Sequence, residues 1–407
     1  MIGSGIFLLP ASLAAYGGIS IIGWIIASIG ALLLAKVFAD LSKRIPKSGG
    51  PYTYTRAGFG DFAAFLVAWG YWISICATNA AITVAMLSYL TVFIPALSDS
   101  VVLSITIGLG TIWFLSWINT RGIQSAGRIQ LVTTILKVLP LFLISVIGIF
   151  YVDLSNLGSF NISGKSNLLA ITETATLTLF AFLGLECATI PAEDIQKGNT
   201  ISKATVLGTY LAIGIYILSS IVLMGLISPE ELQYSKAPFA DAAALLWGES
   251  ARYIVAAGAV ISTFGALNGW LLMQGQIPMS AARDKLFPKP FGKVNDAGSP
   301  AVGIIISSII VSIIMILNFS KGFIKAFEFM ILLSTLTVLV PYLFSSATHI
   351  LLSRDTSDRW YWLTRLLAFI FSLWAVIGSG SEVVFWGFVL LMSGLPVYIF
   401  IKIKSEG

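Results

Sequence analysis

Apolar segments follow one another along almost the whole chain, separated by short polar stretches and by turns that contain glycine and proline. A helix of about 20 apolar residues crosses a hydrocarbon core about 30 Å thick, so each segment is long enough to span a membrane. Strands of a transmembrane β-barrel alternate in polarity and are only about ten residues long, which this continuous pattern excludes. We predict an all-α polytopic membrane protein with twelve transmembrane helices, the first of them incomplete, at residues 1–17, 19–42, 61–95, 100–119, 126–151, 168–191, 203–227, 248–282, 300–318, 326–352, 360–378 and 383–402.

Composition agrees with this class, and the distribution of charge orients the chain. Hydrophobic residues make up 57% and charged residues 11% of the sequence, and the mean hydropathy is +0.92. The net charge is +5, but most of the 24 lysine and arginine residues lie in the loops after the even-numbered spans. Basic residues mark the cytoplasmic side of a membrane protein, so both termini are predicted to be cytoplasmic and no nucleic-acid partner is expected.

Glycines interrupt two of the predicted spans in a matching way. Residues 3–10 run from a Gly-Ser-Gly stretch to a proline, and residues 184–191 repeat this spacing from glycine to proline. An unwound backbone leaves unpaired N–H groups at the start of the following helix, which suits an anion. Irregular backbone in a membrane is tolerated where it is buried in protein or lines a cavity, and paired interruptions in the two halves of a chain are typical of a transporter's substrate site.

Polar residues inside the spans need a partner or a function. Asn79 is predicted either to join neighbouring helices or to contact a substrate. Lys137 costs about 2.5–3.5 kcal/mol on the insertion scale, which favours a functional role. Glu186 follows the second glycine break, where desolvation favours its neutral form; it is a candidate proton carrier, or alternatively a permanent partner of Lys137. Trp270 lies in the middle of a span, where packing alone could also account for it.

The sequence holds no catalytic or cofactor-binding pattern. A nucleophile–base set, a P-loop and metal-ligand spacing are all missing, and no second ligand accompanies the sole histidine, His349. We therefore expect neither enzymatic activity nor a cofactor nor a metal ion. Because Met1 lies directly on the first interruption, we also expect that about half of a span is missing from the first helix.

Together these features resemble the amino acid–polyamine–organocation superfamily, most closely its bacterial branch of arginine/agmatine and basic amino acid/polyamine antiporters. The resemblance covers essentially the whole chain. It implies a bacterial inner-membrane protein with a five-plus-five inverted repeat, formed by residues 1–152 and 168–352, followed by two extra helices in residues 360–403. It rests on Gly3-Ser4-Gly5-Ile6-Phe7-Leu8-Leu9-Pro10, Gly49-Gly50-Pro51, Gly184-Leu185-Glu186, Ala237-Pro238-Phe239, Asp284-Lys285-Leu286-Phe287-Pro288, Val340-Pro341-Tyr342 and Gly378-Ser379-Gly380.

The resemblance also implies a set of residues that bind the substrate. The substrate carboxylate would meet backbone N–H groups of Ser4 and Gly5, and its amino group would meet carbonyl groups near Met1, Phe180 and Leu183. The guanidinium end would meet side chains that match those of the arginine/agmatine antiporter. These are Asn79, Trp270 and Ser334, and Ser74 is a further candidate in the third span.

A second implied set forms an inner gate and couples transport to protons. Tyr71, Glu186 and Tyr342 match a tyrosine–glutamate–tyrosine gate of the antiporter. Lys137 is the second candidate for coupling, because a lysine at this place resembles the proton-coupled and neutral-amino-acid branches, where it substitutes for a bound sodium ion. Two other positions also depart from the antiporter: Phe180 stands in place of a tryptophan and Val338 in place of a threonine.

Two interpretations of transport follow. The first is an exchanger of a cationic amino acid for its decarboxylated amine, and the alternative is a proton-coupled permease for neutral or broad-range amino acids. A receptor that uses the same scaffold without transport is a remote third. The expected partners are an amino acid or polyamine substrate, protons and the lipid bilayer. The sequence leaves open the exact substrate pair, the choice between antiport and symport, and whether the chain forms a homodimer.

Overall fold

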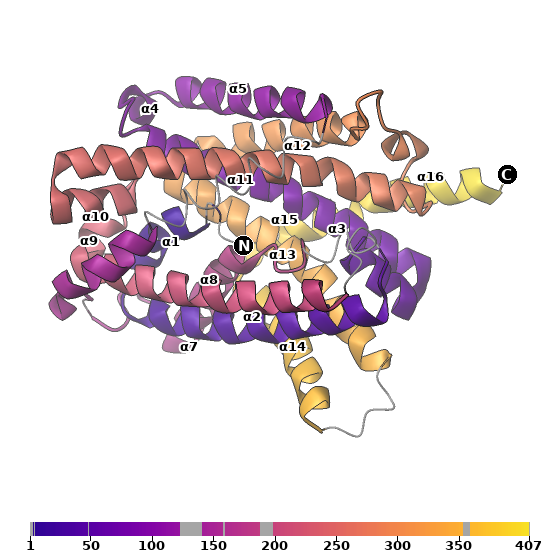
Figure 1. Cartoon of the computed structure of the whole chain (residues 1–407), viewed down its shortest axis with the longest axis horizontal. Helices are drawn as coiled ribbons and strands as arrows, with labels where there is room; N and C mark the ends of the chain where they lie inside the picture. Colours follow the sequence, from indigo (N-terminus) through magenta and orange to yellow (C-terminus); the bar gives the residue numbers. More distant parts are fainter. Residues whose placement is uncertain are drawn as a thin grey trace.

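The computed structural model describes residues 3, 5–47, 49–122, 141–157, 159–187, 198–352 and 359–406. Every regular element within these residues is a helix, which confirms the predicted all-α class. Figure 1 shows the long helices arranged as a bundle along the longest axis of the molecule. Helices α2 (Ile19–Arg44) and α8 (Gly198–Leu226) pack against each other on one flank. Helix α12 (Ala301–Phe319) packs against α5 (Val101–Thr120) on another.

The first half of the chain contains two helices that are interrupted near the glycines. Helix α1 (Gly5–Ala14) begins at the second glycine of the Gly-Ser-Gly stretch, and α7 (Asn167–Leu179) passes into a single 3₁₀ turn, η3 (Phe180–Phe182). Gly184 follows with φ +93°, a conformation that favours glycine because it has no Cβ. The other elements of this half are α2, α3 (Pro51–Leu90), α4 (Ala96–Asp99), α5, the apolar helix Leu141–Tyr151 with its final turn η1 (Ile149–Tyr151), and η2 (Leu154–Leu157).

The second half continues with α8 and is completed by long helices joined by short ones. The long helices are α11 (Glu249–Arg283), α12, α13 (Phe323–Leu351), α14 (Arg359–Ile377), and the consecutive α15 (Ser381–Met392) and α16 (Gly394–Glu406). The connecting elements are α9 (Pro229–Leu232), α10 (Pro238–Trp247) and η6 (Lys289–Gly292).

Helix length and composition support a membrane protein. Among the described residues, 8 helices are long and apolar enough to cross a membrane. Shorter apolar helices at Gly5–Ala14, Leu141–Tyr151, Asn167–Phe182 and Trp362–Ile377 lie within the other predicted spans. The fifth predicted span lies partly outside the described residues, so the count of twelve stays a prediction.

A helical segment that was not predicted precedes the third span. Helix α3 begins at Pro51, ten residues before the predicted start of the span at residue 61. Proline is favoured in the first turn of a helix because its missing N–H group has no helical partner there. Gly60, with φ +78° and ψ −172°, then interrupts the helix, so residues 51–59 form a separate helical segment ahead of the predicted span.

Helix α3 forms the centre of the bundle. In its most apolar stretch 94% of the residues are buried, against 28% in α5 at the periphery. Helix α3 packs chiefly against α13 and α11, and α2 packs against α7 and α8. Small residues allow these close approaches: a Cβ atom at Gly23 of α2 would collide with Thr174 of α7. Helix α3 is therefore the most buried of the long helices compared here, and its side chains contact helices on several sides.

Candidate functional site

The two interrupted segments meet in the middle of the bundle. A Cβ atom placed at Gly5 would lie 3.2 Å from the Cα atom of Ala181 and 3.2 Å from Cδ1 of Phe180. Glycine therefore permits the first turn of α1 to lie directly against η3. The first N–H groups of an α-helix have no partner within their own helix, and the first residue of α1 lies beside the segment where α7 has ended. The start of α1 and the end of α7, where the two interruptions occur, thus lie in contact.

A small cavity lies between these segments and the helices α3 and α11. Its volume is about 20 Å³. This is room for about one water molecule, so the space is far smaller than an amino acid. The cavity is lined by Gly3, Gly5, Thr78, Ile82, Phe180, Ala181, Leu183 and Trp270.

Four of the predicted substrate-binding residues line this central cavity: Gly5, Phe180, Leu183 and Trp270. Phe180 also packs edge-on against Phe327 of α13, with ring centroids 6.1 Å apart. An aromatic face beside backbone N–H groups suits a molecule that carries a carboxylate and a cation. Met1 and Ser4, which the resemblance placed here, lie outside the described residues.

Ser74 and Ser334 lie next to the cavity in a cluster of hydroxyl groups between α3 and α13. The Oγ atoms of Ser74 and Ser334 are 3.1 Å apart, and Oγ1 of Thr78 lies 2.7 Å from Oγ of Ser334. Ser74 also donates to the carbonyl oxygen of Ser334, at 3.0 Å. Of the three, Thr78 lines the cavity, and the two serines join the helices behind it.

Asn79 is not among the residues that line the cavity. Its Nδ2 atom donates to Oε1 of Gln274 at 2.7 Å, and Gln274 in turn donates to Oγ of Ser308 at 2.8 Å. Successive residues of a helix point about 100° apart, so Asn79 and the cavity-lining Thr78 face different neighbours. The structure thus gives Asn79 the interhelical partner that was one of its two predicted roles.

Sequence reasoning missed Thr78, Ile82 and Gln274 as members of the site and its surroundings. The signal that could have found them was helical spacing. Ser74, Thr78 and Ile82 follow one another at intervals of four residues and share one face of α3. Gln274 follows Trp270 by four residues on α11, and an uncharged polar residue in a span needs a partner just as Asn79 does.

The structure also brings together Tyr71, Glu186 and Tyr342, which we call the carboxylate cluster. Tyr71 donates to Oε1 of Glu186 at 2.6 Å, and Tyr342 donates to Oε2 at 2.6 Å. The backbone N–H of Gly184 donates to the same Oε2 atom at 3.2 Å. Glu186 is completely buried, so a carboxylate bound to both tyrosines ties the interrupted segment to α3 and α13.

An aromatic cluster, formed by Phe7, Tyr89 and Phe239, lies on the other side of the cavity. The ring of Phe7 packs edge-on against Tyr89 and Phe239, with centroid distances of 5.6 and 5.8 Å. Tyr89 donates to the carbonyl oxygen of Phe7 at 2.9 Å, and the N–H of Phe239 donates to the Tyr89 hydroxyl at 3.2 Å. These contacts fasten α1 and the start of α10 to the end of α3.

Lys137 lies outside the described residues, so its predicted role stays a prediction. His349 is buried near the end of α13, away from the residues of the central cavity. The described residues contain no group of three or more histidine, cysteine, aspartate or glutamate side chains that could hold a metal ion.

Interrupted helices that meet in the centre of an all-helical membrane bundle are typical of secondary transporters. Comparison with known proteins agrees with this class. Residues 1–400 match the amino acid permease family, so the chain belongs to this family, as the resemblance predicted. Over 100% of its length the chain is 32% identical to the arginine/ornithine antiporter of Pseudomonas aeruginosa, of which it covers 88%. It is 31% identical to the putrescine transporter PotE of Haemophilus influenzae, again over 100% of its length, and covers 95% of that protein.

Proposed function

We propose that the chain is a secondary transporter that exchanges a cationic amino acid, such as arginine, for ornithine or a related amine by alternating access. The observation that carries the proposal is the meeting of two helix interruptions at a small cavity in a member of the amino acid permease family. The names of the two relatives supply the substrate class. The cavity supplies a matching chemistry, with backbone N–H groups for a carboxylate and an indole face for a cation.

We place the substrate carboxylate at the start of α1, beside Ser4 and Gly5, and its cationic end toward Trp270. A cation over an indole ring contributes about 0.5–2 kcal/mol, which selects for charge without fixing the substrate's length. The cavity of about 20 Å³ must widen to admit such a molecule. We propose that it widens when one of the two clusters beside the cavity separates.

The proposed architecture is the five-plus-five repeat of residues 1–152 and 168–352, with 360–403 as an addition. Two features support it. The first predicted helix of each repeat is interrupted, at α1 and after α7. The two longest described helices, α3 with 40 residues and α11 with 35, occupy the third place of each repeat and pack against each other.

The end of the bundle where α2, α11 and α16 terminate is proposed to face the cytoplasm of a bacterium. Basic residues occur in the last turn of each of these helices: Lys43 and Arg44, Arg283, and Lys404. Such a concentration marks the cytoplasmic side. The carboxylate cluster then lies toward the cytoplasm and the aromatic cluster toward the outside.

We further propose that Glu186 carries the coupling proton. When Glu186 is ionised it accepts from both tyrosines and from Gly184, and when it is protonated one oxygen becomes a donor. One of these hydrogen bonds must then rearrange beside the substrate, which biases the side on which the cavity opens. Among the described residues, Cys187 is a further titratable group beside this cluster; its Sγ atom lies 3.8 Å from the Tyr71 hydroxyl.

The test is exchange in proteoliposomes. Radiolabelled arginine is supplied outside, and the lumen contains ornithine, putrescine, agmatine, alanine or buffer alone. We expect rapid uptake with at least one of the cationic internal substrates and little with alanine or buffer. Uptake that is equal with and without an internal substrate would argue for a uniporter or symporter. Better competition by alanine or serine than by lysine would favour the neutral-amino-acid permease.

A further inference from the structure

Two sequence motifs that the central site leaves without a role contact each other, at the end of the bundle where α2 and α11 terminate. Residues 49–51 lead into the short helical segment of residues 51–59, which we call the cover segment. Residues 284–288 follow the last residue of α11. The hydroxyl of Tyr52, the second residue of the cover segment, donates to Oδ2 of Asp284 at 2.9 Å. The two motifs are therefore joined by a hydrogen bond to a carboxylate.

The turn that positions Asp284 is unfavourable in two respects. The N–H of Leu286 donates to the carbonyl oxygen of Ala281 at 2.8 Å and that of Lys285 to Ala282 at 3.1 Å, which is the pattern of a Schellman motif. Glycine usually occupies the left-handed position of this motif, but here it is Lys285, with φ +64°. Asp284 adds a negative charge at the negative end of the helix dipole. Neither residue stabilises the end of α11, so the contact with the cover segment best accounts for the carboxylate.

The cover segment lies against the helices that support the carboxylate cluster. The ring of Phe59 packs edge-on against Phe344 of α13, with centroids 5.3 Å apart, and Phe344 follows Tyr342 by two residues. The ring of Tyr54 lies 6.3 Å from that of Phe38 on α2, which packs 5.4 Å from the ring of Tyr342. A single aromatic ring thus separates the cover segment from a tyrosine of the carboxylate cluster.

Both ends of the cover segment and its polar contact suit a part that moves. Gly50, with φ +58° and ψ −122°, precedes it, and Gly60, with φ +78° and ψ −172°, follows it. A Cβ atom at Gly60 would meet nothing within 4 Å, so glycine is required there by the backbone and not by packing. Nη1 of Arg56 lies 3.9 Å from Oδ1 of Asp284, and the two side chains are 39% and 42% exposed. Water therefore has access to this contact and is able to replace it.

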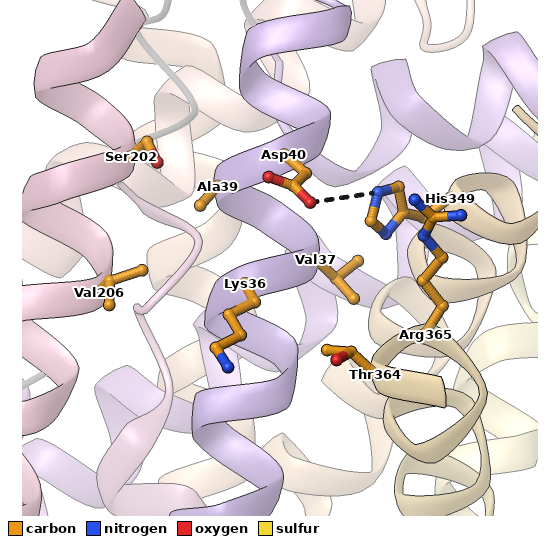
Figure 2. Close-up of a pocket in the computed structure, with 9 residues that line it drawn as sticks. All are labelled: Lys36, Val37, Ala39, Asp40, Ser202, Val206, His349, Thr364 and Arg365. Atoms are coloured by element: carbon orange, nitrogen blue, oxygen red, sulfur yellow. Dashed lines mark ion pairs between the residues drawn. The ribbon is translucent and has the colours of Figure 1, made fainter. Parts of the chain in front are cut away.

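A cavity of about 330 Å³ lies next to the same helix ends, between α2, α8, α13 and α14. Figure 2 shows Val37 and His349 in its wall. They adjoin Phe38 and Thr348, which contact the cover segment: a Cβ atom at Gly58 would lie 2.6 Å from Oγ1 of Thr348. Close-packed helices resist displacement, whereas a cavity leaves them space to shift. Helices α2 and α13 therefore have room to move when the cover segment separates from them.

We propose that the cover segment is a second layer of the cytoplasmic gate, outside the carboxylate cluster, and that the hydrogen bond between Tyr52 and Asp284 is its latch. The inference rests on the proposed function, because alternating access requires this end of the cavity to open. To open it, the hydroxyl and the carboxylate exchange each other for water, and the segment turns about Gly50 and Gly60. Rearrangement at Glu186 then frees the path only when the latch is released as well.

Alkylation of the native thiol Cys187, beside the carboxylate cluster, tests the latch without any substrate. Cys76 is replaced by alanine, and a membrane-impermeant maleimide is applied to each side of oriented vesicles. Tyr52→Phe keeps the ring and removes the donor, so we expect labelling about tenfold faster from the cytoplasmic side and unchanged from the outside. Tyr234→Phe, at an exposed residue, is the matched control. An unchanged rate, or an equal rise from both sides, would overturn the proposal.

A double-mutant cycle shows whether the two residues act as one latch. Asp284→Asn should also speed labelling from the cytoplasmic side, and Asp296→Asn, at an exposed residue of the same loop, should not. Combined with Tyr52→Phe, it should label no faster than Asp284→Asn alone, because both changes remove the same hydrogen bond. Effects that multiply in the double variant would show that the residues act independently and contradict the latch.

Cross-linking separates a latch that opens from a permanent structural contact. Tyr52→Cys and Asp284→Cys are combined in a chain whose Cys76 and Cys187 are alanine, and a short bifunctional maleimide joins the two thiols. We expect the cross-link to abolish arginine exchange, while the same reagent leaves each single-cysteine variant active. Full exchange by the cross-linked chain would overturn the proposal. Absence of exchange in the unmodified chain would instead contradict the proposed function, and the labelling of Cys187 would still test the latch.

Discussion

Tyr71 and Tyr89 lie on the same helix, on opposite sides of the central cavity, and each donates a hydrogen bond to a different kind of acceptor. Tyr71 donates to the carboxylate of Glu186, and Tyr89 donates to the backbone carbonyl of Phe7. Eighteen residues separate the two tyrosines, or about 27 Å along α3. One helix therefore contributes to both clusters, the carboxylate cluster on one side of the cavity and the aromatic cluster on the other.

The two acceptors indicate which side responds to protons. The carboxylate cluster contains a group whose charge changes when it binds a proton, and that change alters which hydrogen bonds are possible. The aromatic cluster contains a neutral carbonyl, an N–H group and apolar rings, none of which titrates near neutral pH. We infer that the two sides open by different means, through protonation and substrate on one side and through substrate alone on the other.

The largest effect is expected from Glu186→Gln. The amide retains the shape of the side chain but holds one fixed charge state, so the pH response of exchange should disappear. Turnover should fall by about 10–100-fold, because hydrogen bonds to a charged acceptor are worth about 1.5–3 kcal/mol. The measurement is the initial rate of arginine exchange from acidic to alkaline pH. Glu230→Gln, at an exposed residue of α9, is the control. Retention of the wild-type pH profile would remove Glu186 from coupling.

A smaller effect is expected from Trp270→Leu, at a residue of the cavity that lies between the two clusters. Replacement by leucine keeps the side chain apolar but removes the π face, which should raise the KM for arginine about 2–30-fold and leave the pH profile intact. Concentration series of arginine uptake measure the change. Trp386→Leu, on the exposed surface of α15, serves as a control. An unchanged KM would place the cation elsewhere.

The smallest effect is expected from Tyr89→Phe in the aromatic cluster. The Phe7 carbonyl and the Phe239 N–H lose a partner while the ring packing stays, which should destabilise the protein by about 1–3 kcal/mol. We expect a few-fold slower exchange with the same dependence on pH. Thermal unfolding and the pH profile together check this. A shifted pH profile would contradict the inference that only the carboxylate cluster responds to protons.

The sequence predicted the backbone features of the site better than the directions of its side chains. The interruptions near Gly5 and Gly184 were predictable because glycines paired in this way within apolar runs favour a break in the helix. The grouping of Tyr71, Glu186 and Tyr342 came from a family resemblance, since no local spacing connects three residues on three different segments. Asn79 and Thr78 are adjacent in sequence, so hydrophobic pattern alone did not show which of them faces the cavity.

Other features depended on the packing of distant helices. The cavity beside His349 requires four helices to diverge, and no motif in the sequence indicates it. The helical segment at residues 51–59 was not predicted, and Gly60, whose φ is positive, separates it from the predicted span. A turn cluster at Gly49-Gly50-Pro51 was visible, but a proline that follows glycines fits a loop as well as the first turn of a helix.

Thiol labelling at Ile82 tests most directly whether the meeting point of the two interruptions is the transport site. Ile82 lines the central cavity, and Ile82→Cys is made in a background where Cys76 and Cys187 are alanine. Alkylation by a membrane-impermeant maleimide is measured from each side of oriented membrane vesicles. We predict labelling from both sides, slowed by arginine or ornithine and unaffected by alanine. Labelling from only one side, or at a rate that no cationic substrate changes, would contradict an alternating-access site at this cavity.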